Sequence, residues 1–221
     1  MAPATKTRRS RLTSRQGLDV YERKRDFKKT PEPAPRRVKG TGPLKFVVQK
    51  HRATALHYDF RLEAGGTLRS WAVPKGPSLD PKQKRLAMEV EDHPLEYASF
   101  EGIIPEGEYG GGTVMVWDEG HWAPMEDADP VRALAKGELR LLLDGKKLKG
   151  SWTLVNTGDR RWLLMKRKDE YASTEDITVT QPRSVRTKRL LANIARDAGG
   201  DVAKAATGDP KTKKARAAAK R

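Results

Sequence analysis

The sequence predicts a mainly β fold, either an antiparallel β-barrel or a strongly curved sheet, with short peripheral helices and disordered basic tails. From Leu44 to about Lys168, short runs rich in Val, Leu, Trp, Phe and Tyr are separated by glycine, which is the pattern of strands joined by turns. Several neighbouring runs are linked by short glycine-containing segments that suit hairpins. Helical periodicity is confined to the two ends of the chain, which favours an all-β centre.

The predicted strands follow one another along this central region. In order, they are Lys45–Lys50, Leu56–Glu63, Thr67–Val73, Lys84–Glu91, Gly112–Trp117, Glu138–Leu143, Gly150–Asn156 and Arg161–Lys166. Hairpin turns are expected at Ala64-Gly65-Gly66, Asp144-Gly145-Lys146-Lys147 and Thr157-Gly158-Asp159. Strands joined by such short turns run antiparallel, so the sheet is expected to be antiparallel.

Short helices are expected outside the strands. Residues 17–29 can form a helix that the following prolines end, because proline cannot continue a helix. Ser184–Arg196 shows helical periodicity, and 198–221, rich in Ala, Lys and Gly, is expected to be a mobile tail. The predicted domain organisation is a disordered basic arm at 1–16, a barrel domain with an N-terminal helical segment at 17–176, and a basic tail, partly helical or disordered, at 177–221.

The positive charge of the chain is concentrated at its two ends. Residues 1–40 carry 13 Lys+Arg against 4 Asp+Glu, residues 176–221 carry 12 against 4, and residues 41–175 carry 20 against 21. The net charge of +16 is therefore divided as +9, +8 and −1. Basic arms suit a polyanion, since each Lys or Arg placed at a phosphate releases counterions. We expect nucleic acid as the partner, in preference to arms that only aid solubility. A membrane surface is disfavoured because neither arm has a large apolar face.

The composition excludes several kinds of site. Because the chain has no cysteine, it has no disulfide, zinc–thiolate site or thiol nucleophile, and a metal site must use His and carboxylates. No apolar run approaches the roughly 18 residues of a membrane span, and the N-terminus lacks the apolar stretch of a secretory signal. We expect a cytoplasmic, nucleoid-associated protein.

The segment 49–63 holds the most suggestive ionisable residues. Alternate side chains of a strand share a face, so the ionisable set is expected on one face and the apolar set on the other, toward the core. The ionisable set is His57, Asp59, Arg61 and Glu63. With His51, these residues offer two imidazoles and a carboxylate, which suit Mn²⁺, Zn²⁺ or Fe²⁺, and an arginine that can hold a phosphate oxygen. Spacing alone leaves open an ordinary surface face of mixed charge.

A second segment, 91–112, combines a histidine with a glycine-rich loop. His93 follows a predicted strand and precedes proline, and strand ends often display functional side chains. Gly107 and Gly110–Gly112 would let a backbone approach a ligand closely. A turn-rich connection with one incidental histidine would explain the pattern at 91–112 equally well. A third segment, K-R-D-F at 24–27, is by itself only a charged helix end.

Several motifs occur in order from about Tyr21 to Asp176. They are Y-x-x-K-R-D-F-x-x-T-x-E-P, F-V-V-Q-K-H-x-A-x-x-L-H-Y-D-F-R-L-E, W-A-V-P-K-G-P, E-D-H-P-L-E-Y-x-x-F-E-G-x-I-P-x-G-x-Y-G-x-G and W-L-L-x-K. In this order they resemble the 3′-phosphoesterase domain of bacterial DNA ligase D, including stand-alone forms of that domain. The resemblance covers most of the chain.

The resemblance implies a metal-dependent enzyme of non-homologous end joining, using Mn²⁺ or another divalent transition metal. Such an enzyme removes a 3′-terminal ribonucleoside from a DNA primer strand and then the 3′-phosphate, leaving a 3′-OH. The matching metal ligands are His51, His57 and Asp59. The positions matching residues at the scissile phosphate are Arg61, His93 and Tyr97, and those matching supporting positions are Gln49, Lys75, Arg85 and Glu91. The N-terminal segment that helps to build the site contributes Arg25, Asp26 and Glu32. The implied partners are primer–template 3′ ends, tipped by a ribonucleotide or a phosphate, and a DNA ligase, repair polymerase or Ku.

Two other functions compete with this hypothesis. In a non-catalytic DNA-binding module, the basic arms would dominate and the histidine face would be inert. A nucleotidyltransferase or ligase fragment is disfavoured, because Asp144-Gly145 follows Leu142-Leu143 where a K-x-D-G motif needs lysine. The chain is expected to be either a stand-alone enzyme or a piece of a larger one. Met1 and the lysine-rich end favour the former.

Overall fold

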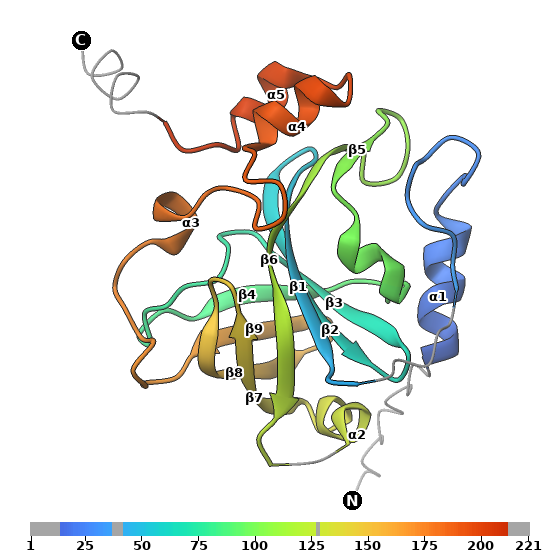
Figure 1. Cartoon of the computed structure of the whole chain (residues 1–221). Coiled ribbons are helices and arrows are strands. Elements are labelled where there is room, and N and C mark those ends of the chain that lie inside the picture. The colour runs from blue at the N-terminus through green and yellow to red at the C-terminus, as the bar shows by residue number, and fades with distance from the viewer. Residues whose placement is uncertain (1–13, 37–41, 127–128, 212–221) are drawn as a thin grey trace, which may run out of the picture.

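The computed structural model describes residues 14–36, 42–126 and 129–211. Eight antiparallel strands close into a barrel, and a short additional strand, β5, lies beside β6 (Figure 1). The strands are β1 (Lys45–Arg52), β2 (Leu56–Ala64), β3 (Thr67–Val73), β4 (Arg85–Glu89), β5 (Gly102–Ile104), β6 (Gly112–Pro124), β7 (Glu138–Gly145), β8 (Lys149–Gly158) and β9 (Arg161–Lys166). The predicted fold class is confirmed, and a closed barrel replaces the alternative of a curved sheet.

Closure of the barrel depends on β6. The strand order is β1-β2-β3-β4-β9-β8-β7-β6, and β6 pairs back onto β1 from Lys45↔His121 to Arg52↔Thr113. The second half of β6 also pairs with β7, where Gly120 lies opposite Gly145. A Cβ on Gly120 would lie only 2.0 Å from the carbonyl oxygen of Asp144, so glycine permits this close approach. As a result, β1 is held on both edges, by β2 and by β6.

The barrel interior is filled by apolar side chains that alternate along the strands. Tyr58, Phe60 and Leu62 of β2 point into it and join the main core cluster, which also contains Trp71 and Trp117. The residues between them face outward. A smaller buried cluster on that outer side consists of Tyr21, Val47, Leu68, Tyr97 and Val116. The predicted division of the second strand into an apolar and an ionisable face is therefore confirmed.

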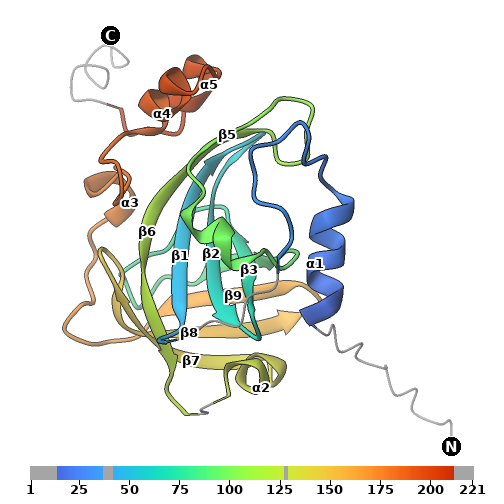
Figure 2. The same ribbon diagram turned by 45° about the vertical axis from the view of Figure 1, so that its right-hand side comes forward.

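The helices lie outside the barrel (Figure 2). They are α1 (Ser14–Arg23), the 3-10 helix η1 (Leu95–Ser99), α2 (Pro130–Ala135), α3 (Ile177–Thr180), α4 (Leu191–Asp197) and α5 (Val202–Ala206). The views agree that α1 lies on the side of the barrel where η1 lies, whereas α3, α4 and α5 follow the last strand on another side. None of these helices is long and apolar enough to cross a membrane.

The N-terminal helix differs from its prediction at both ends. It begins at Ser14, inside the predicted disordered arm, and ends at Arg23 instead of residue 29; residues 1–13 of that arm lie outside the described residues. After Arg23 the chain turns, and the N–H groups of Lys29 and Thr30 donate to the carbonyl of Asp26. This turn replaces the predicted last helical turns and brings Arg25 inward, where it pairs with Glu32.

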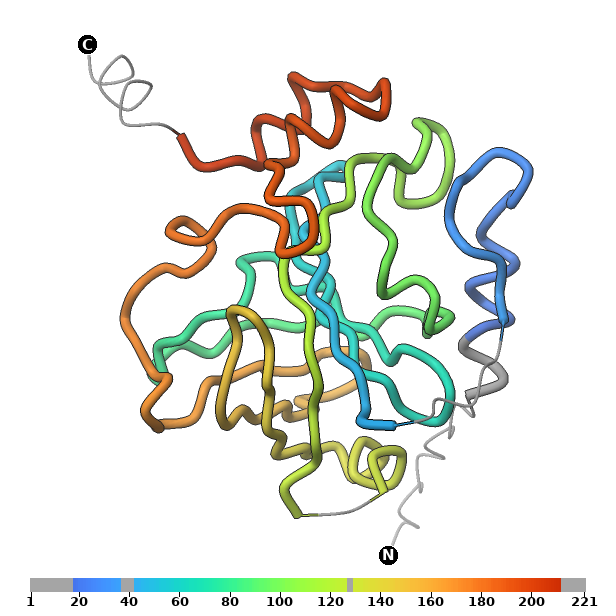
Figure 3. The backbone as a smooth tube through the Cα atoms, viewed as in Figure 1, coloured from blue at the N-terminus to red at the C-terminus, as the bar shows by residue number. Residues whose placement is uncertain are grey.

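The C-terminal segment also differs from the helix and the mobile tail predicted for it. The predicted helix 184–196 is helical only from Leu191 onward, within α4 (Leu191–Asp197), because Lys188 has a positive φ of 59° and the N–H of Val185 donates to the carbonyl of Val116 in β6. The predicted mobile tail contains α5, which lies beside α4 (Figure 3) and has Ala205 as a buried residue. Alanine-rich composition is typical of mobile tails, but it equally suits close packing of helices. Residues 212–221 are outside the described part of the chain.

Candidate metal and phosphate site

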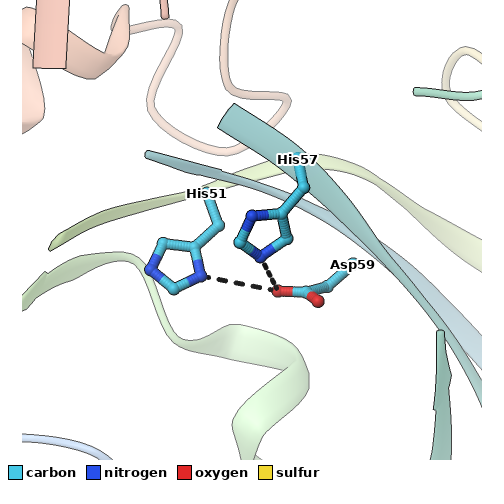
Figure 4. A group of neighbouring side chains, drawn as sticks. All are labelled: His51, His57 and Asp59. Carbon is cyan, nitrogen blue, oxygen red and sulfur yellow. Dashed lines mark ion pairs between the residues drawn. The ribbon is translucent and has the colours of Figure 1, made fainter. Parts of the chain in front are cut away.

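His51, His57 and Asp59 converge on the outer face of the first hairpin. His51 of β1 lies directly opposite His57 of β2, and Asp59 is the next residue on the same face. Nδ1 of His51 lies 3.7 Å and Nε2 of His57 lies 3.6 Å from Oδ2 of Asp59 (Figure 4). One ligand atom from each residue lies within 4.8 Å of the others. Two imidazole nitrogens and a carboxylate oxygen form a donor set that suits a divalent transition metal.

The charges around Asp59 keep its carboxylate ionised. Burial works to raise the pKa of Asp59, but Arg61 and the hydrogen bonds from His51 and His57 hold that pKa well below its ordinary value. Burial works to lower the pKa of His57, and the neighbouring Asp59 outweighs it, so the pKa of His57 is raised. An ionised carboxylate between two imidazoles is therefore present at neutral pH, as a metal-binding group requires.

Arg61 extends this group toward a second cluster. Its Nη2 lies 3.2 Å from Oδ2 of Asp59. Its Nε donates to Gln49 at 2.8 Å and its Nη1 to Ser70 at 2.9 Å. The Gln49 side chain donates in turn to the carbonyls of Tyr97 and Phe100. Gln49 and Ser70 therefore fix the plane of the guanidinium, whose fork suits phosphate oxygens.

His93 lies between two arginines and is buried. Nδ1 lies 2.9 Å from the Glu91 carbonyl and 2.9 Å from Nη1 of Arg61, and Nε2 lies 3.3 Å from Nη2 of Arg25. Burial, together with Arg61 and Arg25, holds the pKa of His93 well below its ordinary value. A neutral imidazole has one N–H, and the Glu91 carbonyl is the acceptor among these partners, so the N–H is placed on Nδ1. Nη1 of Arg61 lies beside Nδ1 without a hydrogen bond to it. Nε2 then accepts from Arg25.

The free energy of unfolding of the metal-free protein is expected to depend on His93 as pH falls. Below about 6.5, the ordinary pKa of histidine, the unfolded chain takes up a proton that buried His93 does not, so stability is lost as pH falls toward the folded pKa. This slope is at most about 1.4 kcal/mol per pH unit. Urea denaturation in EDTA should show a shallower loss for His93→Gln than for the unchanged protein.

The measured quantity is the difference in pH slope between the unchanged protein and His93→Gln, because His57 changes the stability with pH in the opposite direction to His93. The raised pKa of His57 contributes stability below the unfolded pKa that is lost as pH rises through the folded pKa. Identical pH slopes for the unchanged protein and His93→Gln would contradict a neutral, buried His93.

Arg25 enters the cluster from the N-terminal segment. Its side chain is 4% exposed, pairs with Glu32 at 2.8 Å and lies 3.5 Å from Glu91. Its guanidinium stacks over the ring of Tyr21 at 3.8 Å. The ring of Tyr21 meets the rings of His93 and Tyr97 edge to face, at 5.0 and 6.1 Å. The N-terminal segment therefore covers the cluster and adds a second arginine to it.

The structure brings together most, but not all, of the predicted site residues. A continuous series of pairwise contacts connects ten of them: His51, His57, Asp59, Arg61, Gln49, His93, Tyr97, Glu91, Arg25 and Glu32. Asp26 lies apart, because its half-exposed carboxylate accepts from the N–H of Lys28 and pairs with Lys29.

Lys75 and Arg85 stand at the two ends of the connection between β3 and β4. Lys75 is exposed. By alternation along β4, Arg85 lies on the same side of the strand as the core residue Ala87. Within the described ranges, no hydrogen bond or ion pair joins either side chain to the cluster, so their predicted supporting role stays a prediction.

Three residues that contact the site were not predicted from the sequence. Tyr21 is fully buried under Arg25, Ser70 accepts from Arg61, and Lys24 donates to Glu91 at 3.1 Å and to the hydroxyl of Tyr109 at 2.9 Å. Tyr21 and Lys24 belong to the motif around K-R-D-F, and that motif was their only signal. Ser70 lies opposite Arg61 on β3, and no pattern in the sequence distinguishes it.

Comparison with known proteins identifies similar sequences in one family. The family model of the DNA ligase D 3′-phosphoesterase domain matches residues 49–156. The chain is 52% identical over 189 residues to the multifunctional non-homologous end joining protein LigD of Pseudomonas aeruginosa, an alignment covering 81% of this chain and 22% of that protein.

Mycobacterial relatives show the same relationship. The LigD protein of Mycolicibacterium smegmatis is 42% identical over 160 residues, covering 69% of this chain and 21% of the relative. The LigD protein of Mycobacterium tuberculosis is 45% identical over 155 residues, covering 69% and 20%. The chain thus spans about a fifth of the length of the curated relatives it matches.

Proposed function

Since the chain belongs to the DNA ligase D 3′-phosphoesterase family, we propose that it is a divalent-metal phosphoesterase that heals 3′ ends of DNA in non-homologous end joining. It removes a 3′-terminal ribonucleoside and then the 3′-phosphate. In the first step a water oxygen bonds to phosphorus, the bond from phosphorus to O5′ breaks, and O5′ takes a proton. In the second step another water releases inorganic phosphate and leaves a 3′-OH.

The observation that carries this proposal is the shared carboxylate of Asp59. Its Oδ2 lies within 3.7 Å of both histidines and within 3.2 Å of Arg61. A phosphate held by Arg61 therefore lies next to the group that would hold the metal. The residues that would hold the metal are His51, His57 and Asp59, with Mn²⁺ as the proposed ion. When bound, a divalent ion neutralises phosphate oxygens and lowers the pKa of a bound water.

The protein's own residues supply orientation and charge. Arg61 and Arg25 would neutralise non-bridging oxygens of the phosphate, and Gln49 and Glu32 hold the two guanidinium groups in place. Both arginine side chains are 4% exposed, with Arg61 over the ring of Tyr97 and Arg25 over that of Tyr21, so little water screens their charges.

His93 is proposed to act at the leaving oxygen. The phosphate between Arg61 and Arg25 gains a second negative charge in the transition state of the first step and carries two in the second. These charges would offset the two arginine charges that add to burial in lowering the pKa of His93, so the ring could take a proton there. His93 would then donate that proton to the leaving oxygen or stabilise the transition state as a hydrogen-bond donor.

A labelled primer–template with one 3′-terminal ribonucleotide tests the proposed function. With Mn²⁺ we expect two successive products, the primer shortened to a 3′-phosphate and then to a 3′-OH, and with EDTA neither. A chain that binds the primer–template but shortens it in neither condition would instead be the non-catalytic DNA-binding module. Inorganic phosphate release, measured separately, distinguishes the second step from the first.

A further inference from the structure

A cleft lies beside the metal-binding group, on the side of His51. Its volume is about 380 Å³, near the lower end of the range for small-molecule sites. It is formed by the turn after β1, the loop between β5 and β6, and one residue of α5. The lining residues are Ala53, Thr54, Glu106, Gly107, Glu108, Gly110, Gly111 and Lys204. A Cβ on Gly110 would lie 3.7 Å from Cε1 of His51, so the Gly110 backbone joins the cleft to the proposed metal site.

The lining is rich in hydrogen-bond acceptors. Glu106 is paired with Lys204 at 3.2 Å, whereas the carboxylate of Glu108, which is half-exposed, has no hydrogen bond or ion pair to any described residue. Gly107 has a φ of 89° and open space where a Cβ would lie. An unpaired carboxylate repels phosphate and accepts hydrogen bonds from hydroxyl groups. The cleft therefore suits a neutral group with several hydroxyl donors.

The ring of His51, which lies next to Gly110 of the cleft lining, has a nitrogen without a hydrogen-bond partner in the described part of the chain. Its Nε2 is buried and has no hydrogen-bond partner among the described residues. In Figure 4 this nitrogen points away from Asp59, while Nδ1 points toward it. A histidine that ligates a metal through one nitrogen normally donates from the other to an oxygen. The missing acceptor indicates that a ligand oxygen or an ordered water belongs beside this ring.

We propose that this cleft receives the nucleoside that leaves in the first step, and that Glu108 accepts hydrogen bonds from its vicinal 2′- and 3′-hydroxyls. This assignment rests on the proposed function. A 3′-terminal ribonucleoside has no phosphate beyond its sugar, so its far end is neutral and rich in donors, as the lining requires. The second step removes a phosphate that carries no nucleoside, so the cleft takes no part in it.

The difference between the two steps gives the kinetic test. For Glu108→Gln, kcat/KM on a ribonucleotide-tipped primer should fall about 10-fold or more, as expected on losing a hydrogen bond to a charged acceptor. It should approach the value for a primer tipped by a 2′,3′-dideoxynucleotide. Hydrolysis of a 3′-phosphate primer should stay within about 2-fold. Glu175→Gln, an exposed glutamate just before α3, is the matched control and should change neither. Equal losses in both steps, or no loss in either, would overturn the assignment.

A binding measurement separates this inference from the proposed function. Adenosine added to the metal-free full-length chain should shift the amide resonances of Gly107, Gly110 and Gly111, and 2′,3′-dideoxyadenosine should shift them less. Glu108→Gln should remove the difference between the two nucleosides. If the unchanged protein hydrolyses neither primer but shows these shifts, the proposed function fails and only the binding of a nucleoside at the cleft remains supported. Absence of the shifts overturns the cleft assignment whether or not the primers are hydrolysed.

Discussion

Replacing His57 with alanine is expected to weaken Mn²⁺ binding by more than about 100-fold and to lower phosphoester hydrolysis to match. Removing a partner behind a metal ligand typically costs about 10- to 100-fold in affinity or activity, and removing the ligand itself should cost more. His57 is suitable because its side chain is the most exposed of the three proposed ligands, so the fold should tolerate its loss. Mn²⁺ affinity by calorimetry and hydrolysis rate should be measured on the same preparation.

The other histidines provide the controls for this experiment. The chain has four histidines, and His121 is exposed on β6, away from the candidate site. His121→Ala should leave both metal affinity and turnover unchanged. His93→Ala should lower turnover while Mn²⁺ affinity stays nearly intact, because His93 contacts Arg61 and Arg25 and lies outside the metal-binding group. Full Mn²⁺ affinity in His57→Ala would mean that the metal binds elsewhere.

Replacing Arg61 with alanine is expected to lower kcat about 100- to 1000-fold at saturating metal, the usual loss when one preorganised donor is removed from a developing charge. It should also destabilise the fold. Breaking a buried ion pair costs about 3–5 kcal/mol because the partner charge remains, and Asp59 is only 6% exposed. Urea denaturation reports the second effect and steady-state kinetics the first.

Arg61→Lys separates charge from geometry. Lysine retains the positive charge near Asp59 but loses the fork that donates to Gln49 and Ser70. We therefore expect most of the stability to return while most of the rate loss remains. Arg167→Ala, at an exposed arginine just after β9, should change neither quantity. A kcat within about 3-fold of the unchanged protein in Arg61→Ala would exclude a phosphate contact of the size proposed.

Alternation along the strands was enough to predict the local part of the site. It placed His57, Asp59 and Arg61 on one outward face, because the apolar residues between them must fill the core. One inward-facing residue, however, is not apolar, and nothing in the sequence indicated it. Lys50 is buried on the inward face of β1, with its Nζ 5.8 Å from the centre of the Tyr58 ring, where the composition of the run would suggest an exposed charge.

The non-local part of the site was beyond sequence patterns. Arg25, Glu32, Glu91 and His93 meet only because the barrel closes and the N-terminal segment crosses its outer face, and periodicity contains no information about such contacts. The motifs implied these residues through the family resemblance alone. Even so, the resemblance did not distinguish Arg25, which contacts His93, from its neighbour Asp26, whose half-exposed carboxylate pairs with Lys29. That distinction depends on the turn after Arg23.

The placement of the three proposed metal ligands on one hairpin has a consequence for the order of folding. His51 and His57 meet by closing a short turn, and hairpins form in about 1–10 μs. Arg25 must find Glu91 and His93 across 66 and 68 residues, and such distant contacts have a larger loop-closure entropy. We expect a nascent or refolding chain to capture the ion before it can hold a phosphate. Metal uptake would then mark an early stage of folding, and phosphate binding its completion.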